Sequence, residues 1–420
     1  MLNLKILPAF LILFFLNSFA CSQQNSQTGS EPVKEIPEEE ATIVEQDGPV
    51  DMSLLTGAQQ PDAFLPLIEG KKVALVVNQT STIAETHLVD RLLSVGVDIQ
   101  TIFAPEHGFR GTADAGAQIK DGKDAKTGIP LISLYGKKKK PLPSDLKGLD
   151  YIVFDIQDVG ARFYTYISSM SYVMEACAEN GVSFIVLDRP NPNGHYVDGP
   201  VLKDGFSSFV GLHNIPVVHG MTVGEYAQMV NGEGWLKGNV QCDLTVVKCK
   251  NYDHQTFYSL PIKPSPNLPN MQSIYLYPSL CFFEGTIVSI GRGTNKQFQV
   301  IGHPDYKIGS FTFIPKPMEG AQNPKLNGVV CTGVDLSSST LESLRAEKQL
   351  NLNYLIDFYQ VLDQPNSFFL KNNFIDKLAG SSQLREQIKS GMSADEIRAS
   401  WQDGIAAFKK VRNKYLLYPE

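Results

Sequence analysis

The sequence lacks the motifs of several common enzyme and binding classes. No GxGxxG follows the first predicted strand and no Walker lysine motif occurs, which argues against a nucleotide site. There is no GxSxG elbow for a serine nucleophile, and the histidines form no HxxxH or HExxH pair. We therefore expect neither a cofactor nor a metal ion, and the chemistry has to come from other side chains.

Charge of one sign is not in large excess. The 420 residues contain 37 Lys+Arg against 44 Asp+Glu, a formal net charge of −7, so a basic surface for nucleic acid is not indicated. The one basic run, residues 137–140, is interpreted as a solvated loop. Hydrophobic residues make up 43%, which is ample for a globular core.

Cysteine is scarce, with six residues and no CxxC pair. If Cys21 is modified as described below, an odd number remains, which favours buried thiols over a disulfide framework. A pair between Cys242 and Cys249 is the one conceivable disulfide.

The first 21 residues predict an export signal. The apolar segment ILPAFLILFFL is too short for a comfortable membrane span, and NSFA precedes Cys21. This pattern resembles a bacterial lipoprotein signal, in which the cysteine carries the lipid; a secretory signal cleaved near Ala20 is the alternative. Either reading predicts an exported protein, and lipidation predicts a membrane-anchored lipoprotein that faces the periplasm. Residues 22–53 are polar and acidic and predict a disordered tether.

From about residue 70 apolar strands alternate with helical segments. Such continuous apolar strands predict a mainly parallel sheet covered on both faces, in an α/β domain over residues 54–262. A helix ending at Gly181 and a capping box from Thr222 to Glu225 mark two of its helices. The predicted strands cover residues 71–80, 97–106, 129–136, 149–158, 182–190 and 242–249.

The composition changes at a proline- and asparagine-rich stretch, residues 260–270. Beyond it we expect a smaller α+β domain, residues 263–420, that closes a cleft over the first. Its predicted strands cover residues 311–315 and 328–336, and its predicted helices residues 353–362, 374–391 and a single last helix from Ser393.

Polar residues follow several predicted strands. Carboxyl ends of parallel strands share one edge of a sheet, so these residues should gather there. Asp155 and Asp188 could equally cap turns, with Arg162 and Arg189 as their partners. The candidates at this edge are Asn78, Glu106, His107, Arg110, Asp155, Gln157, Asp158, Arg162, Asp188, Arg189 and Asn191.

These residue types suit a sugar site. Carboxylates, amides and arginines bind hydroxyl and carboxylate groups, and Tyr164 and Tyr166 offer rings or phenols. Glycoside hydrolysis needs a protonated acid and a second group that acts as base or nucleophile. Glu106, flanked by Pro105 and Phe109, suits the acid because partial desolvation raises a carboxyl pKa. From the second domain Asn267, Glu284 and Arg292 are expected to face the same cleft.

Several segments together resemble one family. They are APEHGFRGTADAG, LDYIVFDIQDVGARFYTYISSM, VLDRPNPNG, HGMTVGEYA, PSPNLPN, YPSLCFFEGTIVSIGRGT and FQVIGHP. In order and spacing they resemble the exo-β-N-acetylmuramidase (NamZ-like) family, over about residue 54 to the end. The resemblance implies a Rossmann-like domain with a smaller C-terminal one, Glu106 as catalytic acid, and family positions at Arg162, Tyr164 and Tyr166.

The resulting hypothesis is an exo-acting glycosidase that releases N-acetylmuramic acid from the non-reducing end of peptidoglycan fragments. Asp158, Glu284, a tyrosine or the substrate's acetamide is the second catalytic group. One of Arg110, Arg162, Arg189 or Arg292 should bind the lactyl carboxylate. The alternative is a lipid-anchored protein that binds muropeptides or sugars without catalysis; an amide or serine hydrolase lacks its nucleophile motif.

Overall fold

The computed structural model describes residues 53–109 and 121–420, and these described residues belong to one compact unit. Cys21, Arg110 and residues 22–52 of the predicted tether lie outside the described residues. None of the helices in the described ranges is long and apolar enough to cross a membrane.

A seven-stranded sheet forms the centre of the first part, in the order β5-β6-β4-β1-β7-β8-β9. Every neighbouring pair is parallel except β5 with β6. All six predicted strands are present in this sheet. The strands are β1 (Lys72–Val77), β4 (Asp98–Ala104), β5 (Gly122–Lys123), β6 (Pro130–Ser133), β7 (Tyr151–Asp155), β8 (Ser183–Leu187) and β9 (Leu244–Val247).

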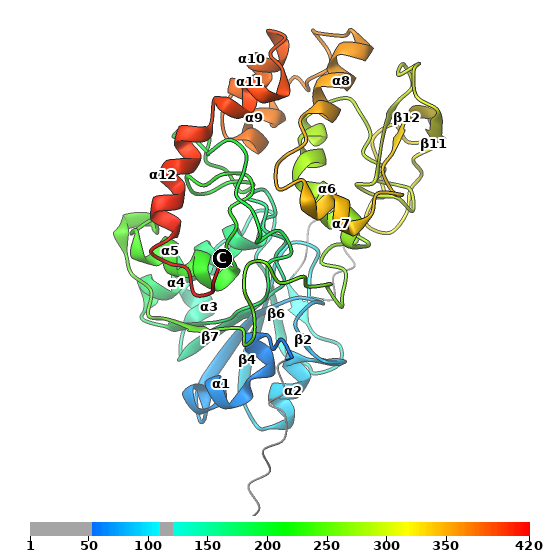
Figure 1. The fold of residues 1–420 in the computed structure, drawn as a ribbon. Coiled ribbons are helices and arrows are strands. Elements are labelled where there is room, and N and C mark those ends of the chain that lie inside the picture. The colour runs from blue at the N-terminus through cyan, green and yellow to red at the C-terminus, as the bar shows by residue number, and fades with distance from the viewer. Residues whose placement is uncertain (1–52, 110–120) are drawn as a thin grey trace, which may run out of the picture. The chain divides into compact units, whose positions relative to one another are not determined.

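Successive side chains of each central strand enter opposite hydrophobic cores. In β1, Val73 and Leu75 belong to one core, whereas Ala74 and Val76 belong to the other. This two-residue alternation is the geometry of an extended strand, and both faces are covered because both sets are apolar. Helices α1 (Pro61–Ile68) and α2 (Leu88–Ser94) cover one face, and α4 (Tyr166–Asn180) and α5 (Val223–Gly232) the other (Figure 1).

The helix signals in this part are confirmed. Helix α4 ends at Gly181, whose φ of 66° lies in the left-handed region that glycine adopts without strain. Helix α5 begins with the capping box of Thr222 and Glu225. The remaining short elements are η1 (Gly57–Gln59), β2 (Thr82–Ile83), β3 (Thr86–His87), α3 (Pro143–Leu146) and η2 (Lys237–Asn239).

The C-terminal part is smaller and has a three-stranded antiparallel sheet, β10-β12-β11. The two predicted strands are β11 and β12. Its elements are α6 (Met271–Leu280), η3 (Cys281–Gly285), β10 (Val300–His303), β11 (Phe311–Phe313), β12 (Cys331–Asp335), α7 (Leu341–Ala346), α8 (Asn353–Leu362), α9 (Phe374–Ala379), α10 (Gln383–Lys389), α11 (Ala394–Ala399) and α12 (Gln402–Arg412).

Two helices predicted as continuous are broken. The segment 374–391 forms α9 and α10, because Gly380 takes a left-handed φ of 79° that ends α9. The helix from Ser393 is interrupted between α11 and α12, so the prediction of a single last helix is wrong, although its capping box at Ser393 is present. Apolar periodicity continues through both breaks. Leu378 and Leu384 are buried on either side of the first, and Ile397 and Ile405 on either side of the second.

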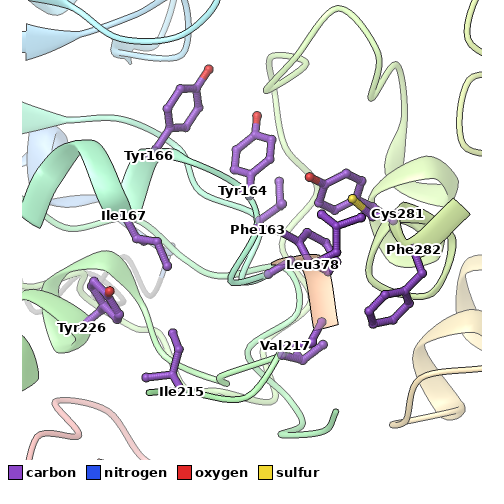
Figure 2. Close-up of a cluster of buried hydrophobic side chains, with 14 of the residues drawn as sticks. Phe163, Tyr164, Tyr166, Ile167, Ile215, Val217, Tyr226, Cys281, Phe282 and Leu378 are labelled. Atoms are coloured by element: carbon purple, nitrogen blue, oxygen red, sulfur yellow. The ribbon is translucent and has the colours of Figure 1, made fainter. Parts of the chain in front are cut away.

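The two parts share one core. The larger core cluster contains residues of β1, α4 and α5 as well as residues of α6, α8 and α12. Figure 2 shows Phe163 near Cys281, Phe282 and Leu378, and Phe163 is edge-on to Phe282 at 5.8 Å. The predicted boundary between residues 262 and 263 stays a prediction.

The last residues of the chain bind the first part. Tyr418 donates a hydrogen bond to Asp188 at 2.6 Å, and the Leu417 amide donates to Glu225 at 2.8 Å. Both acceptors are buried carboxylates. The described cysteines are all free and buried, as predicted.

Candidate active site

A cavity of about 500 Å³ is lined by residues that follow β4, precede α4 and occupy loops of the C-terminal part. Both polar groups and aromatic rings reach it, as in typical small-ligand sites. Seven of the predicted site residues line it: Glu106, His107, Tyr164, Tyr166, Asn267, Glu284 and Arg292.

Glu106 lies in a tight turn directly after β4. The Gly108 amide donates to the Pro105 carbonyl at 3.0 Å, and His107 between them has a φ of 66°. A non-glycine residue with positive φ is uncommon, and such strain gathers at functional sites. The turn directs the half-buried Glu106 into the cavity.

Two hydroxyl groups bind the Glu106 carboxyl. Thr165 donates from Oγ1 to Oε2 at 2.6 Å, and the Tyr135 phenol is its second hydroxyl partner. Burial, followed by the charge and hydrogen bond of Glu106, raises the pKa of Tyr135 above its usual value, so this phenol stays protonated. The Glu106 carboxyl is therefore held in one orientation.

The second carboxylate of the cavity is Glu284, in η3. Arg292 donates to it from both Nε, at 3.2 Å, and Nη2. Both side chains are about one-quarter exposed, and the guanidinium also lies 5.1 Å from the Phe298 ring centre. This pair is thus fixed in place while still reachable by a ligand.

The two tyrosines hold the proline-rich segment rather than pointing freely into the cavity. The Tyr164 hydroxyl donates to the Pro264 carbonyl at 2.8 Å, and the Tyr166 hydroxyl reaches the same oxygen at 3.4 Å. Figure 2 shows the two side chains extending in the same direction, with their hydroxyl groups at the far end. The ring planes are nearly perpendicular, and the ring centres are 4.9 Å apart. Burial raises the pKa of both phenols, which keeps them neutral.

His107 and Asn267 also bind the chain on this wall. His107 Nε2 lies 3.3 Å from the Ser265 hydroxyl, and Asn267 donates to the Gly320 carbonyl at 2.8 Å. Ser265 thus contacts the turn that carries Glu106, and Asn267 ties the same segment to the loop at Gly320.

The structure places seven other predicted site residues outside the cavity lining. They form a buried polar network beneath the carboxyl ends of the sheet, and we name them the rim network: Asn78, Asp155, Gln157, Asp158, Arg162, Arg189 and Asn191.

The two arginines of the rim network bind protein groups rather than the cavity. Arg189 binds Asp155 through Nε at 2.5 Å and Nη2 at 2.9 Å. Arg162 donates to the carbonyls of Pro200, Ile215 and Leu378. Arg162 thereby links the first part to α9, and both guanidinium groups are turned away from a ligand.

The amides of the rim network stabilise the loops in the same way. Gln157 donates to the carbonyls of Asp158 and Pro190 at 2.8 and 2.7 Å. Asn191 donates to Met221 at 2.9 Å and packs on Gly160, where any Cβ would lie 2.2 Å from the Asn191 amide oxygen. Asn78 accepts hydrogen bonds from Thr80.

Asp158 is enclosed behind the tyrosines. Its Oδ1 accepts from the Gly160 amide at 2.7 Å, while its buried Oδ2 has no hydrogen-bond partner. Burial raises the pKa of Asp158 to about 7. A carboxyl in this position has no route to a glycosidic bond in the cavity.

The position at which open α/β sheets usually bind a ligand is occupied in this protein by residues of its own loops. The order of strands reverses between β1 and β7, where open α/β sheets bind their ligands. Here the Ser81 hydroxyl donates to the Asp155 carbonyl, and the Gln157 amide donates to Thr80 at 3.0 Å. The open space lies instead at the end of β4, which carries Glu106.

Among the cavity residues that were not identified from the sequence are Tyr135, Thr165, Phe209 and Lys325. Thr165 lies inside the quoted GARFYTY motif, but the other three lie in loops with no pattern that marks them. The basic run was only partly a solvated loop, since Lys139 lies 4.5 Å from the Phe209 ring centre and Lys140 pairs with Glu175. Among the described residues no group of His, Cys, Asp or Glu is arranged to hold a metal ion.

Together, the Rossmann-like sheet and this cavity define an α/β protein with a sugar-type site. The site combines one carboxyl held by hydroxyl donors, a second carboxylate held by an arginine, and aromatic walls.

The chain belongs to the NamZ family of exo-β-N-acetylmuramidases. The N-terminal model of that family matches residues 73–272 and the C-terminal model residues 275–418. The sequence is 39% identical over 383 residues to the peptidoglycan β-N-acetylmuramidase NamZ of Bacillus subtilis (strain 168), covering 85% of this chain and 90% of that protein. The resemblance seen in the sequence is thus confirmed.

Two solved structures from Bacteroides fragilis NCTC 9343 are similar, both described as DUF1343 family proteins. One is 48% identical with a TM-score of 0.81 and covers 88% of this chain and 99% of its own. The other is 30% identical with a TM-score of 0.72 and covers 87% and 99%. These neighbours confirm the predicted α/β fold with its smaller C-terminal domain.

Proposed function

We propose that this protein is an exo-acting glycoside hydrolase that releases N-acetylmuramic acid from the non-reducing end of peptidoglycan fragments. The observation that carries the proposal is the orientation of Glu106 in the cavity, held by Thr165 and Tyr135. Membership of the NamZ family, whose curated member in Bacillus subtilis is named a peptidoglycan β-N-acetylmuramidase, supports the same substrate.

Glu106 is the proposed general acid. Loss of a sugar alkoxide is slow without a proton, and a positioned acid contributes roughly 10²–10⁴-fold in rate. Thr165 donates to Oε2, which holds the carboxyl on the cavity wall, where it can meet the glycosidic oxygen of a bound substrate.

The second catalytic group is proposed to come from the cavity. Of the two carboxylates considered from the sequence, Glu284 lines the cavity and Asp158 does not. Glu284 is held in position by its ion pair with Arg292. The substrate's own acetamide is the alternative that needs no protein base.

The test uses the purified full protein in detergent with a chromogenic N-acetylmuramic acid glycoside. Release of the chromophore, together with N-acetylmuramic acid as the sugar product, is the expected result. Tight binding of the glycoside without any product would favour the non-catalytic binding protein instead.

We also propose that the protein is an exported lipoprotein, membrane-anchored through Cys21 and facing the periplasm. The support is the apolar segment ending in NSFA before this cysteine. The protein should partition with membranes, and a Cys21→Ser variant should not. Recovery of the unmodified protein wholly in the soluble fraction would refute the anchor.

A further inference from the structure

One corner of the cavity carries more positive than negative charge. Glu284 lies there between two cations, Arg292 and Lys325, and all three line the cavity. The carboxylate is ion-paired with Arg292, and the charge of Lys325 acts on the same group. We name these three residues the cationic corner.

Lys325 is held by backbone carbonyl groups rather than by an acid. Its Nζ donates to the Phe283 carbonyl at 3.0 Å and to the Thr286 carbonyl. A lysine ammonium has three donors, and no third acceptor for it is present in residues 53–109 and 121–420. One charged N–H therefore remains to bind a ligand in the cavity.

The other titratable groups near the corner do not balance its charge. Burial lowers the pKa of His303, which leaves this imidazole neutral at pH 7. Burial raises the pKa of Tyr277 and of Cys281, so the phenol and the thiol are neutral too. One carboxylate against two cations leaves the corner itself with a net charge of about +1, which favours an anionic ligand. The other acid that lines the cavity, Glu106, belongs to the wall at the end of β4.

We propose that Lys325 and Arg292 together bind the lactyl carboxylate of N-acetylmuramic acid. The proposal rests on the proposed function and names the residues that select its substrate. Charge-assisted hydrogen bonds from two cations are among the stronger polar contacts, and N-acetylglucosamine offers no acid to receive them. Binding of the acid at this corner leaves the rest of the ring to extend toward the Glu106 wall of the same cavity.

The ionisation of Lys325 gives the proposal a second observable. Burial lowers the pKa of Lys325 to about 8. The charge of Glu284 opposes this shift, and the charge of Arg292 adds to it. A bound carboxylate favours the charged lysine, so affinity is full below this pKa and falls as the pH rises through it. The same linkage predicts proton uptake when the acid binds near pH 8.

The experiment compares two aryl glycosides, one of N-acetylmuramic acid and one in which its lactyl acid is converted to the amide. We expect KM for the acid to be about 10–100-fold below KM for the amide in the unmodified protein. Lys325→Met should raise KM for the acid by about 10-fold or more and leave KM for the amide nearly unchanged. Lys325→Arg should recover part of the difference.

The matched control is Lys316→Met, since Lys316 is an exposed lysine nine positions earlier, outside the cavity lining. It should change neither KM. If Lys325→Met does not fold, the unmodified protein decides: KM for the acid should rise above pH 8, and KM for the amide should not.

The outcomes separate the two proposals. Cleavage of neither glycoside by the unmodified protein would overturn the proposed function. If both glycosides are cleaved with equal KM values, the assignment of the cationic corner alone is overturned. The same holds if Lys325→Met changes the two KM values equally.

Discussion

Two arginine–carboxylate pairs of this protein have the same chemistry and opposite surroundings. Arg189 and Asp155 are 3% and 0% exposed, whereas Arg292 and Glu284 are 25% and 26% exposed. The first pair lies in the rim network and the second lines the cavity. An enclosed pair stabilises the fold, because its loss leaves a buried charge, while a reachable pair can exchange partners with a ligand. The polar residues predicted for the site thus divide into two groups with different functions.

The largest effect should come from the cavity side of this comparison. Glu106→Gln keeps the acceptor for Thr165 but removes the transferable proton. We expect turnover of a natural disaccharide to fall by roughly 10²–10⁴-fold, with little change in melting temperature or sugar binding. An aryl glycoside with a good leaving group should lose less, because it needs less protonation. Full activity on the disaccharide would make Glu106 a structural residue.

The enclosed pair should respond in stability instead. Asp155→Asn leaves the Arg189 guanidinium buried without its counter-charge and should lower the free energy of unfolding by about 3–5 kcal/mol. The matched variant at the reachable pair, Glu284→Gln, should lower it by only about 0–1 kcal/mol. Urea unfolding of the two variants measures both. Similar losses at the two sites would mean that exposure does not separate the pairs.

Titration of Asp158 should make the free energy of unfolding depend on pH. Its folded pKa of about 7 lies above the usual 3.8, so the folded state binds its proton more tightly than the unfolded state. Its contribution to stability is therefore fully present below about pH 4 and declines as the pH rises to 7, by a few kcal/mol at most. Asp158→Asn should abolish this decline relative to the unmodified protein, in thermal unfolding between pH 4 and pH 8. Parallel pH curves would show that Asp158 does not titrate in this range.

The smallest effect is expected at Tyr135. Tyr135→Phe removes one hydroxyl partner of Glu106 and keeps the ring that packs on Phe209, 5.8 Å away. Since Thr165 still holds the carboxyl, we expect kcat to fall by no more than about 10-fold, consistent with one hydrogen bond. The pH profile of kcat should shift as well, whereas a purely structural role would leave the profile in place.

The sequence predicted where the strands lie along the chain, but it did not predict which polar side chains are buried and which reach the cavity. Apolar runs located all six strands of the parallel sheet, because buried strands between helices leave a clear pattern. Glu106 was identified because an acid after an apolar strand stands out. Arg162 and Arg189 were equally conspicuous, yet their long side chains turn inward to carbonyl groups or Asp155, which no local pattern reveals.

Lys325 is the opposite case, an inconspicuous residue in the sequence that lines the cavity. It lies in the loop segment PKLNG, where a lysine is ordinarily taken as solvated, and only the tertiary fold brings it beside Glu284. The broken helices at Gly380 and Trp401 have a related cause. The apolar period persists because each short helix packs separately on the same core, so periodicity alone could not show the interruptions.

The attachment of Leu417 and Tyr418 to Glu225 and Asp188 has a practical consequence for handling the protein. Trimming of these residues by a carboxypeptidase would remove one donor from each of two buried acids, so preparations with ragged carboxyl termini should melt earlier. A purification tag is better fused ahead of residue 53 than after Glu420, whose carboxylate binds Arg412. The last residues of the chain thus stabilise the first part of the structure through Asp188, which follows β8, and Glu225 in α5.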